Sequence, residues 1–225
     1  MKVFAHFSRH LGLASGLLLC LSIAAAPATA ATITFNFSGT IDRVQNLLTP
    51  PFTTSNSPTA MTGSMTVNTL DTNASLTHGN YAVQNFNIQI GSYSATFGGS
   101  GLVEIRNGSG NGPGADRFIT TVTPLTGSPV NFLSPRLFDM DLRGPNTVFG
   151  SDALPTAMPS ISSFSGNNQW RLVFGPQGLS RVVSGTIASL TAVPLPAAVI
   201  LFGAGLVALA GLGAGSWKQR KNGLA

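Results

Sequence analysis

Between residues 31 and 192 the apolar residues alternate with polar ones in short runs, and this pattern constrains the fold more than any other feature. In the run 32–41, for example, Ile33, Phe35 and Phe37 share one face of an extended strand. The other runs with this period are 61–67, 86–90, 93–97, 102–105, 118–122, 137–142, 170–174 and 182–190. Lys and Glu, which favour helices, are scarce, and β-branched and aromatic residues are common. The pattern predicts an all-β, antiparallel domain of about nine strands.

Strands with one apolar face must bury that face against a second layer. We therefore expect a β-sandwich, jelly-roll-like in its connections, and a closed barrel is the alternative. Gly91-Ser92, between two of the runs, predicts a two-residue hairpin turn, and 47–60 and 144–160 are expected to be long loops. The similar segments Phe-Ser-Gly-Thr-Ile at 37–41 and Val-Ser-Gly-Thr-Ile at 183–187 suggest that the last strand pairs with the first. Such a pairing would bring the two ends of the domain together.

The first 30 residues have the pattern of a secretory signal peptide. Lys2 and Arg9 precede an apolar stretch at 11–23, and Ala28 and Ala30 provide the small residues that a signal peptidase requires. The pattern predicts a signal helix, export through the Sec translocon and cleavage after Ala30.

The only cysteine, Cys20, lies inside this predicted leader. Leu19 before it is not the small residue that acylation as a lipoprotein requires, so cleavage after Ala30 is favoured. The mature chain would then contain no disulfide, thiolate ligand or cysteine nucleophile.

The C-terminal region predicts a single transmembrane helix. Residues 197–215 form an uncharged, largely apolar run, and about 19 helical residues can cross a hydrocarbon core of about 30 Å. Lys218, Arg220 and Lys221 follow in the tail 216–225 and would stop transfer and stay in the cytoplasm. We expect the helix to anchor the chain in the inner membrane.

Val193-Pro194-Leu195-Pro196 stands directly before this helix, and Leu-Phe-Gly-Ala-Gly-Leu follows at 201–206. This arrangement resembles the PEP-CTERM sorting signal of Gram-negative, exopolysaccharide-producing bacteria. The resemblance implies that an exosortase, a membrane transpeptidase-like enzyme, recognises Val193, Pro194, Leu195 and Pro196 and cleaves or transfers the chain. Leu195 stands where the namesake motif has Glu, which implies another exosortase subtype or a protein that stays anchored.

These features divide the chain into a signal peptide at 1–30, an ectodomain at 31–192 and a sorting signal at 193–225. All seven acidic residues and seven of the twelve basic residues lie in the ectodomain, which is therefore close to neutral. The sequence pI of about 10.2 comes from the two terminal segments. A neutral ectodomain lacks the basic surface that nucleic acids require, so we expect no nucleic-acid partner.

Few ectodomain residues suggest chemistry. His78 is the only histidine after the leader, and a polar turn explains it. Asp139 and Asp141 flank Met140 and would face the same side of a strand about 7 Å apart. Such a pair could bind Ca²⁺ or act as acid and base. Ion pairs with the neighbouring Arg136 and Arg143 are the simpler interpretation.

Two loop features complete the candidates. The Gly-rich segment 107–116 lacks the residues of a phosphate-binding loop, and we expect a flexible hairpin loop there. Asn73 is the best candidate glycosylation site, because Asp71 extends its sequon to Asp-x-Asn-x-Ser.

The sequence thus predicts an exported protein of the cell surface or extracellular matrix, structural in a biofilm, with no catalysis, cofactor or metal. Its expected partners are the export and sorting enzymes and exopolysaccharide. The alternative is a carbohydrate-binding module in which Tyr81, Tyr93 or Trp170 stacks on sugars. Trp170 alternates with apolar residues and is more consistent with the core. An extracellular hydrolase that uses Asp139 and Asp141 is the least favoured function.

Overall fold

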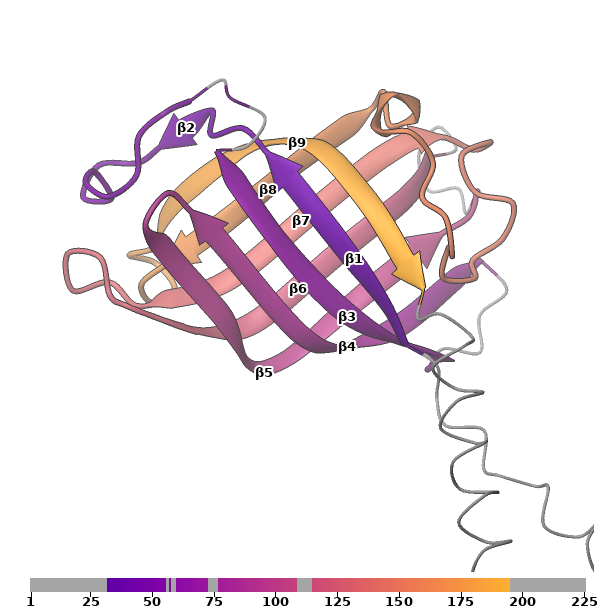
Figure 1. The fold of residues 1–225 in the computed structure, drawn as a ribbon, viewed down its shortest axis with the longest axis horizontal. Coiled ribbons are helices and arrows are strands. Elements are labelled where there is room, and N and C mark those ends of the chain that lie inside the picture. The colour runs from indigo at the N-terminus through magenta and orange to yellow at the C-terminus, as the bar shows by residue number, and fades with distance from the viewer. Residues whose placement is uncertain (1–31, 56, 58–59, 73–76, 109–114, 195–225) are drawn as a thin grey trace, which may run out of the picture. The chain divides into compact units, whose positions relative to one another are not determined.

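The computed structural model describes residues 32–194, apart from 56, 58–59, 73–76 and 109–114. These residues form nine strands and a short 3-10 helix, η2 (Ile161–Ser163) (Figure 1). The strands are β1 (Thr32–Gly39), β2 (Arg43–Val44), β3 (Met61–Asp71), β4 (His78–Ile90), β5 (Tyr93–Arg106), β6 (Ala115–Gly127), β7 (Pro135–Pro145), β8 (Asn167–Phe174) and β9 (Arg181–Pro194). The all-β, antiparallel class predicted from the sequence is confirmed.

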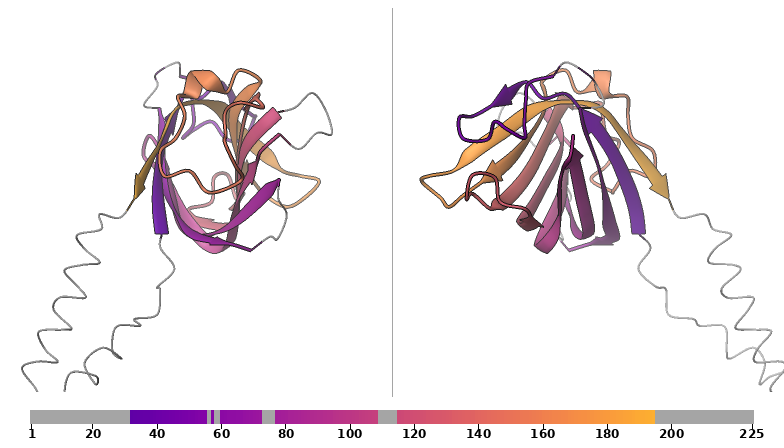
Figure 2. Two further views of the ribbon diagram at one scale, coloured as in Figure 1. Left: turned by 90° about the vertical axis from the view of Figure 1, so that its right-hand side faces the viewer. Right: turned by 60° about the vertical axis from the view of Figure 1, so that its left-hand side comes forward.

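The sheet closes on itself into a barrel, so the predicted β-sandwich is wrong. Strands β1 and β3–β9 pair in the order β1-β3-β4-β5-β6-β7-β8-β9, and β9 returns to pair with β1 (Figures 1 and 2). The short β2 adds to β9 outside this ring. Alternation shows only that each strand has one buried face. Whether that face meets a second sheet or the opposite wall of the same sheet depends on strand order and twist.

Aromatic side chains fill the interior of the barrel. Phe138 packs against both Phe37 and Phe86, with ring centroids 5.5 and 4.9 Å away, and it also stacks on Trp170 at 6.4 Å. The largest fully buried side chains are Trp170, Phe35, Phe52, Phe86, Phe118, Phe138 and Phe174. An eight-stranded barrel is just wide enough for side chains to fill it, and these rings make the interior a packed core.

The strands meet at two ends, which we name by their contents. The loop end consists of the connections 40–60, 91–92, 128–134 and 175–180. The seam end contains the first residue of β1 and the last of β9, because Ile33 pairs with Pro194. The described residues of both predicted long loops, 47–60 and 144–160, lie outside the strands except Gly144 and Pro145, which end β7, and their side chains help to close these ends. Phe52 of the first packs 5.0 Å from Tyr93, and Phe149 of the second packs 5.9 Å from Phe164.

Local sequence signals predict the β4–β5 hairpin but not the length of β5. Ile90 pairs with Tyr93 across the expected two-residue turn, and Gly91 has the positive φ (57°) that such a turn requires. The runs 93–97 and 102–105 were expected to be separate strands. They form the single strand β5, whose register with β6 shifts between Phe97 and Ser100. The intervening glycines therefore mark a bulge rather than a turn.

The predicted pairing of the last strand with the first is confirmed, and glycine makes the close approach possible. Gly39 and Gly185, the central residues of the two similar segments, lie where β1 and the following residue Thr40 meet β9. A Cβ on Gly185 would collide with the Thr40 carbonyl, and one on Gly39 with the Thr186 carbonyl. Trp170 Nε1 donates to the same Thr40 carbonyl at 3.0 Å. At these two glycines the backbones of the first and last strands are in direct contact, next to the indole ring of Trp170.

The helices predicted at 1–30 and 197–215 lie outside the residues that the structure describes. Within those residues, no helix is long and apolar enough to cross a membrane.

Candidate functional site

Most of the predicted processing residues lie outside the described part of the chain. This applies to the cleavage-site residues Ala28 and Ala30, to the stop-transfer residues Lys218, Arg220 and Lys221, and to Asn73, Leu195 and Pro196. Val193 and Pro194 are described, and they form the last two positions of β9, opposite Thr34 and Ile33. The barrel wall therefore extends two residues into the segment that resembles a sorting signal.

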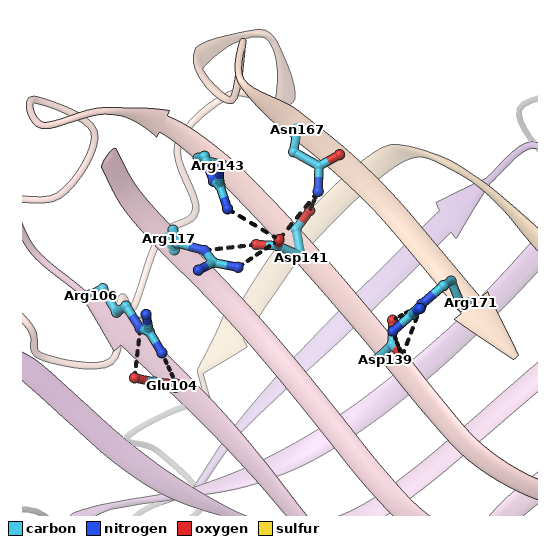
Figure 3. A network of polar contacts seen from close by, with 8 residues as sticks. All are labelled: Glu104, Arg106, Arg117, Asp139, Asp141, Arg143, Asn167 and Arg171. Carbon is cyan, nitrogen blue, oxygen red and sulfur yellow. Dashed lines mark hydrogen bonds and ion pairs between the residues drawn. The ribbon is translucent and has the colours of Figure 1, made fainter. Parts of the chain in front are cut away.

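Asp139 and Asp141 face the same side of β7, as expected, and each carboxylate is held by arginine (Figure 3). Asp139 accepts hydrogen bonds from Arg171, which lies directly opposite on β8, with the shortest at 2.7 Å. Asp141 accepts from Arg117 at 2.7 and 3.0 Å. Of the predicted partners, Arg143 lies 3.9 Å from Asp141, whereas Arg136 donates to the Gly175 carbonyl. The prediction for Arg136 was wrong because cross-strand register, not proximity in sequence, selects the partner.

These pairs belong to a ladder of charges on the outer wall across β5–β8. Glu104 and Arg106 add a two-bonded pair on β5, with the shorter contact at 2.7 Å. The hydrogen bonds to Glu104 raise the pKa of Arg106, and those to Asp139 raise the pKa of Arg171. Among the described residues, no three His, Cys, Asp or Glu side chains are placed to share a metal ion. The arrangement stabilises neighbouring strands and leaves each carboxylate occupied by a guanidinium.

The aromatic residues considered for sugar stacking are buried. Trp170 has no exposed surface, and Tyr81 and Tyr93 are 4% and 6% exposed. The Tyr81 hydroxyl donates to the Asp152 carbonyl at 2.9 Å, and the Tyr93 hydroxyl has no hydrogen-bond partner among the described residues. Burial raises the pKa of Tyr93 to about 12. None of the three rings can stack on a ligand, so that assignment was wrong for both tyrosines.

Asp116 has a structural role that the sequence analysis missed. This carboxylate is fully buried and accepts hydrogen bonds from the backbone amides of Gly108 and Phe149, both at 2.7 Å. It ties the β5–β6 connection to the long loop after β7 at the seam end. The segment 107–116 was predicted to be a flexible hairpin loop, but its last two residues, Ala115 and Asp116, begin β6, and 109–114 lie outside the described residues.

His78, at the start of β4, is partly exposed, and its Nδ1 lies 2.9 Å from the Thr77 hydroxyl. The polar turn predicted for His78 is not observed, because the residue begins a strand and pairs with Arg106 of β5.

The part of the outer wall around the recess between β1, β3, β4 and β9 is uncharged and rich in hydroxyl and amide groups. Asn87 Nδ2 donates to Ser64 Oγ at 2.6 Å, and the hydroxyls of Ser38 and Ser189 are 2.7 Å apart across the seam. These side chains line a shallow recess of about 380 Å³. Because its groups are uncharged and largely bonded to one another, this wall offers little to a charged ligand.

The loop end is the most unusual surface of the barrel. Leu47, Phe132 and Leu179 project from three different connections there and are 54%, 99% and 67% exposed. Asn131 Nδ2 donates to the Leu47 carbonyl, which links the first two connections. A Cβ placed on Gly175 would be 3.1 Å from the Leu133 side chain. The third connection, 175–180, therefore lies alongside the second, 128–134. We call Leu47, Phe132 and Leu179 the apolar tips.

Two recesses lie beside the apolar tips. One, of about 420 Å³, is lined by Arg43, Val44, Gln45, Asn46 and Arg181. The other, of about 390 Å³, is lined chiefly by prolines and serines, namely Pro50, Pro51, Pro129, Ser92, Ser94 and Ser128. Neither Arg43 nor Arg181 forms an ion pair with a carboxylate of the described chain. Arg181 Nη1 donates to the neighbouring Ser180 carbonyl at 3.1 Å. The loop end therefore combines exposed apolar side chains with guanidinium groups that have no carboxylate partner among the described residues.

Comparison of the chain with protein-family models, with curated proteins and with solved structures finds no match. The observations define the class of architecture, an antiparallel eight-stranded barrel with one added strand, and leave function to be argued from the surfaces described above.

Proposed function

We propose that the chain is an exported protein of the cell surface or extracellular matrix. A leader directs it through the inner membrane, and an exosortase processes its C-terminal segment. The barrel then acts as a non-catalytic structural module in a matrix that contains exopolysaccharide. The sorting part of this proposal depends on the resemblance of 193–225 to a PEP-CTERM signal.

The pairing of Ile33 with Pro194 is the observation that best supports this function. It connects the predicted leader and the predicted sorting segment to the same end of one closed barrel. Cleavage after Ala30 would cut before β1 begins at Thr32, and cleavage at or beyond Pro194 would leave β9 complete. Both cuts can therefore be made without loss of a strand or a core side chain.

The outer wall suits a protein that must persist among polysaccharides. Carboxylates of the β5–β8 wall are paired with arginines, and the opposite wall presents neutral hydroxyl and amide groups. A surface of this kind has little long-range field with which to attract charged macromolecules nonspecifically.

Intact-mass spectrometry of the protein recovered from an exporting host, with and without exosortase, tests the proposal. We expect an N-terminus at Ala31 and, when exosortase is present, a C-terminus near Pro194–Ala197. Pro196→Ala should prevent the C-terminal cut, whereas Pro176→Ala, on the exposed β8–β9 connection, should not. Retention of Lys218–Ala225 in cells that contain the enzyme would indicate a simple anchor. Recovery from the cytosol with the leader intact would refute export.

A further inference from the structure

The apolar tips lie at one end of the barrel although they come from distant parts of the sequence. Large apolar side chains exposed beyond a third of their surface are few in the described chain, and Leu47, Phe132 and Leu179 share one end of the barrel. The Asn131–Leu47 hydrogen bond and the contact of Leu133 with the Gly175 region hold their loops together. Clustered apolar side chains on a soluble surface usually mark an interaction site.

The backbone at Phe132 is held in a conformation that its side chain disfavours. Asn131 and Phe132 have φ angles of 46° and 68°, in the left-handed region. Val130 and Leu133 exchange backbone hydrogen bonds of 3.0 and 2.9 Å and so close a tight turn around them. Gly is the usual residue in the second of these positions. A phenyl ring that is 99% exposed gains no burial there, so the strain has no compensation within the barrel.

The charge at the loop end is positive. Arg43 and Arg181 line the recess beside Leu47, and Arg136 lies nearby at the start of β7. Asp42, a carboxylate on the neighbouring β1–β2 connection, accepts hydrogen bonds from the hydroxyls of Thr40 and Thr186. Neither Arg43 nor Arg181 is paired with a carboxylate of the described residues, so their charge can attract an anionic partner.

We propose that the loop end docks on an anionic lipid surface. The apolar tips would enter the boundary between headgroups and acyl chains, and Arg43 and Arg181 would contact lipid phosphates. The three apolar side chains project separately, and a folded protein could bury them only if it had a complementary pocket for each. We therefore favour a lipid surface. A fluid bilayer accommodates any arrangement of tips, and anionic headgroups attract the neighbouring arginines. The described chain begins and ends at the opposite, seam end, where Ile33 pairs with Pro194.

The test uses the full chain held in nanodiscs of neutral phosphatidylcholine, so that its C-terminal segment is already occupied by lipid. Co-sedimentation with added phosphatidylglycerol vesicles then reports on the barrel, and empty nanodiscs give the background. We expect capture of the wild-type chain and about tenfold or greater weakening by Phe132→Gly. Glycine relieves the positive φ, so the melting temperature of this variant should equal or exceed that of wild type. Leu70→Ser, which alters a side chain 60% exposed on β3 away from the loop end, is the matched control and should bind normally.

The charge contribution is tested separately. Arg43→Gln combined with Arg181→Gln should weaken capture by phosphatidylglycerol about tenfold and leave any capture by phosphatidylcholine vesicles unchanged. Arg143→Gln on the β7 wall is the control for loss of a cation. Failure of the wild-type chain to bind, normal binding by Phe132→Gly, or equal loss with Leu70→Ser would overturn the proposal. So would clustering of loaded nanodiscs without vesicles that disappears in Phe132→Gly, because the tips would then pair two copies of the chain. The assay uses the uncut chain and contains no exosortase, so its outcome is separate from that of the C-terminal processing test.

Discussion

Ile33 lies opposite Pro194 across the seam between β1 and β9, and from there the pairing runs one to one as far as Ser38 and Ser189. Closure of the barrel depends on this segment, because it satisfies the backbone groups that would otherwise form two open edges. The extent of the seam also sets a boundary for processing of the C-terminal segment. A cut beyond the pair leaves a closed wall, and a cut well before it does not.

We expect truncation after Ile187 to unfold the barrel and truncation after Pro194 to leave it folded. The shorter chain loses the β9 residues that face 33–38 of β1, including the buried Leu190. Exposed edges and an opened core should abolish cooperative unfolding or cause aggregation. Circular dichroism during thermal unfolding checks this. A cooperative transition in the shorter chain would show that the seam is dispensable.

Gly185→Ala should destabilise the fold by about 2–4 kcal/mol, in the range of overpacked or strained core positions. The new methyl group would collide with the Thr40 carbonyl and approach Trp170 Nε1, so the indole–carbonyl hydrogen bond would be disturbed as well. Gly150→Ala is the matched control, because a Cβ there meets nothing within 4 Å. Urea unfolding of both variants measures the difference, and equal midpoints would contradict the close contact at the seam.

Tyr93→Phe should stabilise the protein at neutral pH by about 1 kcal/mol, since it removes a buried hydroxyl that has no partner. It should also remove a pH dependence. Burial raises the Tyr93 pKa to about 12, so between pH 10 and 12 the unfolded chain releases this proton while the folded chain keeps it. The free energy of unfolding should therefore fall as pH rises through this window in wild type, and fall less in Tyr93→Phe. Parallel pH profiles of the two proteins would refute burial of an un-ionised phenol.

Asp116→Asn should cost about 1–3 kcal/mol although it preserves size. The carboxylate accepts from the amides of Gly108 and Phe149, and a carboxamide can accept one of these and must turn its own NH₂ toward the other. Hydrogen exchange should accelerate at these two amides before the barrel strands are affected. Unchanged exchange at both amides would show that their hydrogen bonds to Asp116 do not hold these two segments together.

Neutralising the outer ladder should have a smaller effect. We expect Arg171→Gln to cost at most about 0.5 kcal/mol, because its side chain is 57% exposed and solvent screens the pair. Asp141→Asn should cost more, about 1 kcal/mol, since it weakens contacts with Arg117, Arg143 and Asn167 together. Chemical denaturation in low and high salt measures the loss of stability in each variant. High salt should reduce the difference in stability between Asp141→Asn and Arg171→Gln.

The strand pattern could be predicted from the sequence because alternation is a local property. Ile33, Phe35 and Phe37 point inward as their period requires, and Gly91-Ser92 turns the chain where glycine permits a positive φ. The two Ser-Gly-Thr-Ile segments correctly indicated that β9 returns to β1, because both need glycine at the same crossing.

The candidate sites were less predictable, because side-chain environment depends on residues far away in the chain. Asp139 pairs with Arg171 rather than with the nearer Arg136, since register places them opposite each other. Tyr93 is buried because Phe52 and Phe174, from distant segments, close over it. Phe132 gave no signal as a single apolar residue in a loop, and only its exposed position beside Leu47 gives it meaning.

Alone, the sequence determined which residues are extended, which side of each strand is apolar, and that the last strand pairs with the first. These properties follow from the two-residue period of the chain and the conformational freedom of glycine. Tertiary structure decided that the apolar faces meet across one closed wall rather than between two sheets. It also decided that three distant loops bring their apolar tips together, because closure and loop proximity arise from long-range pairing and twist that no local pattern encodes.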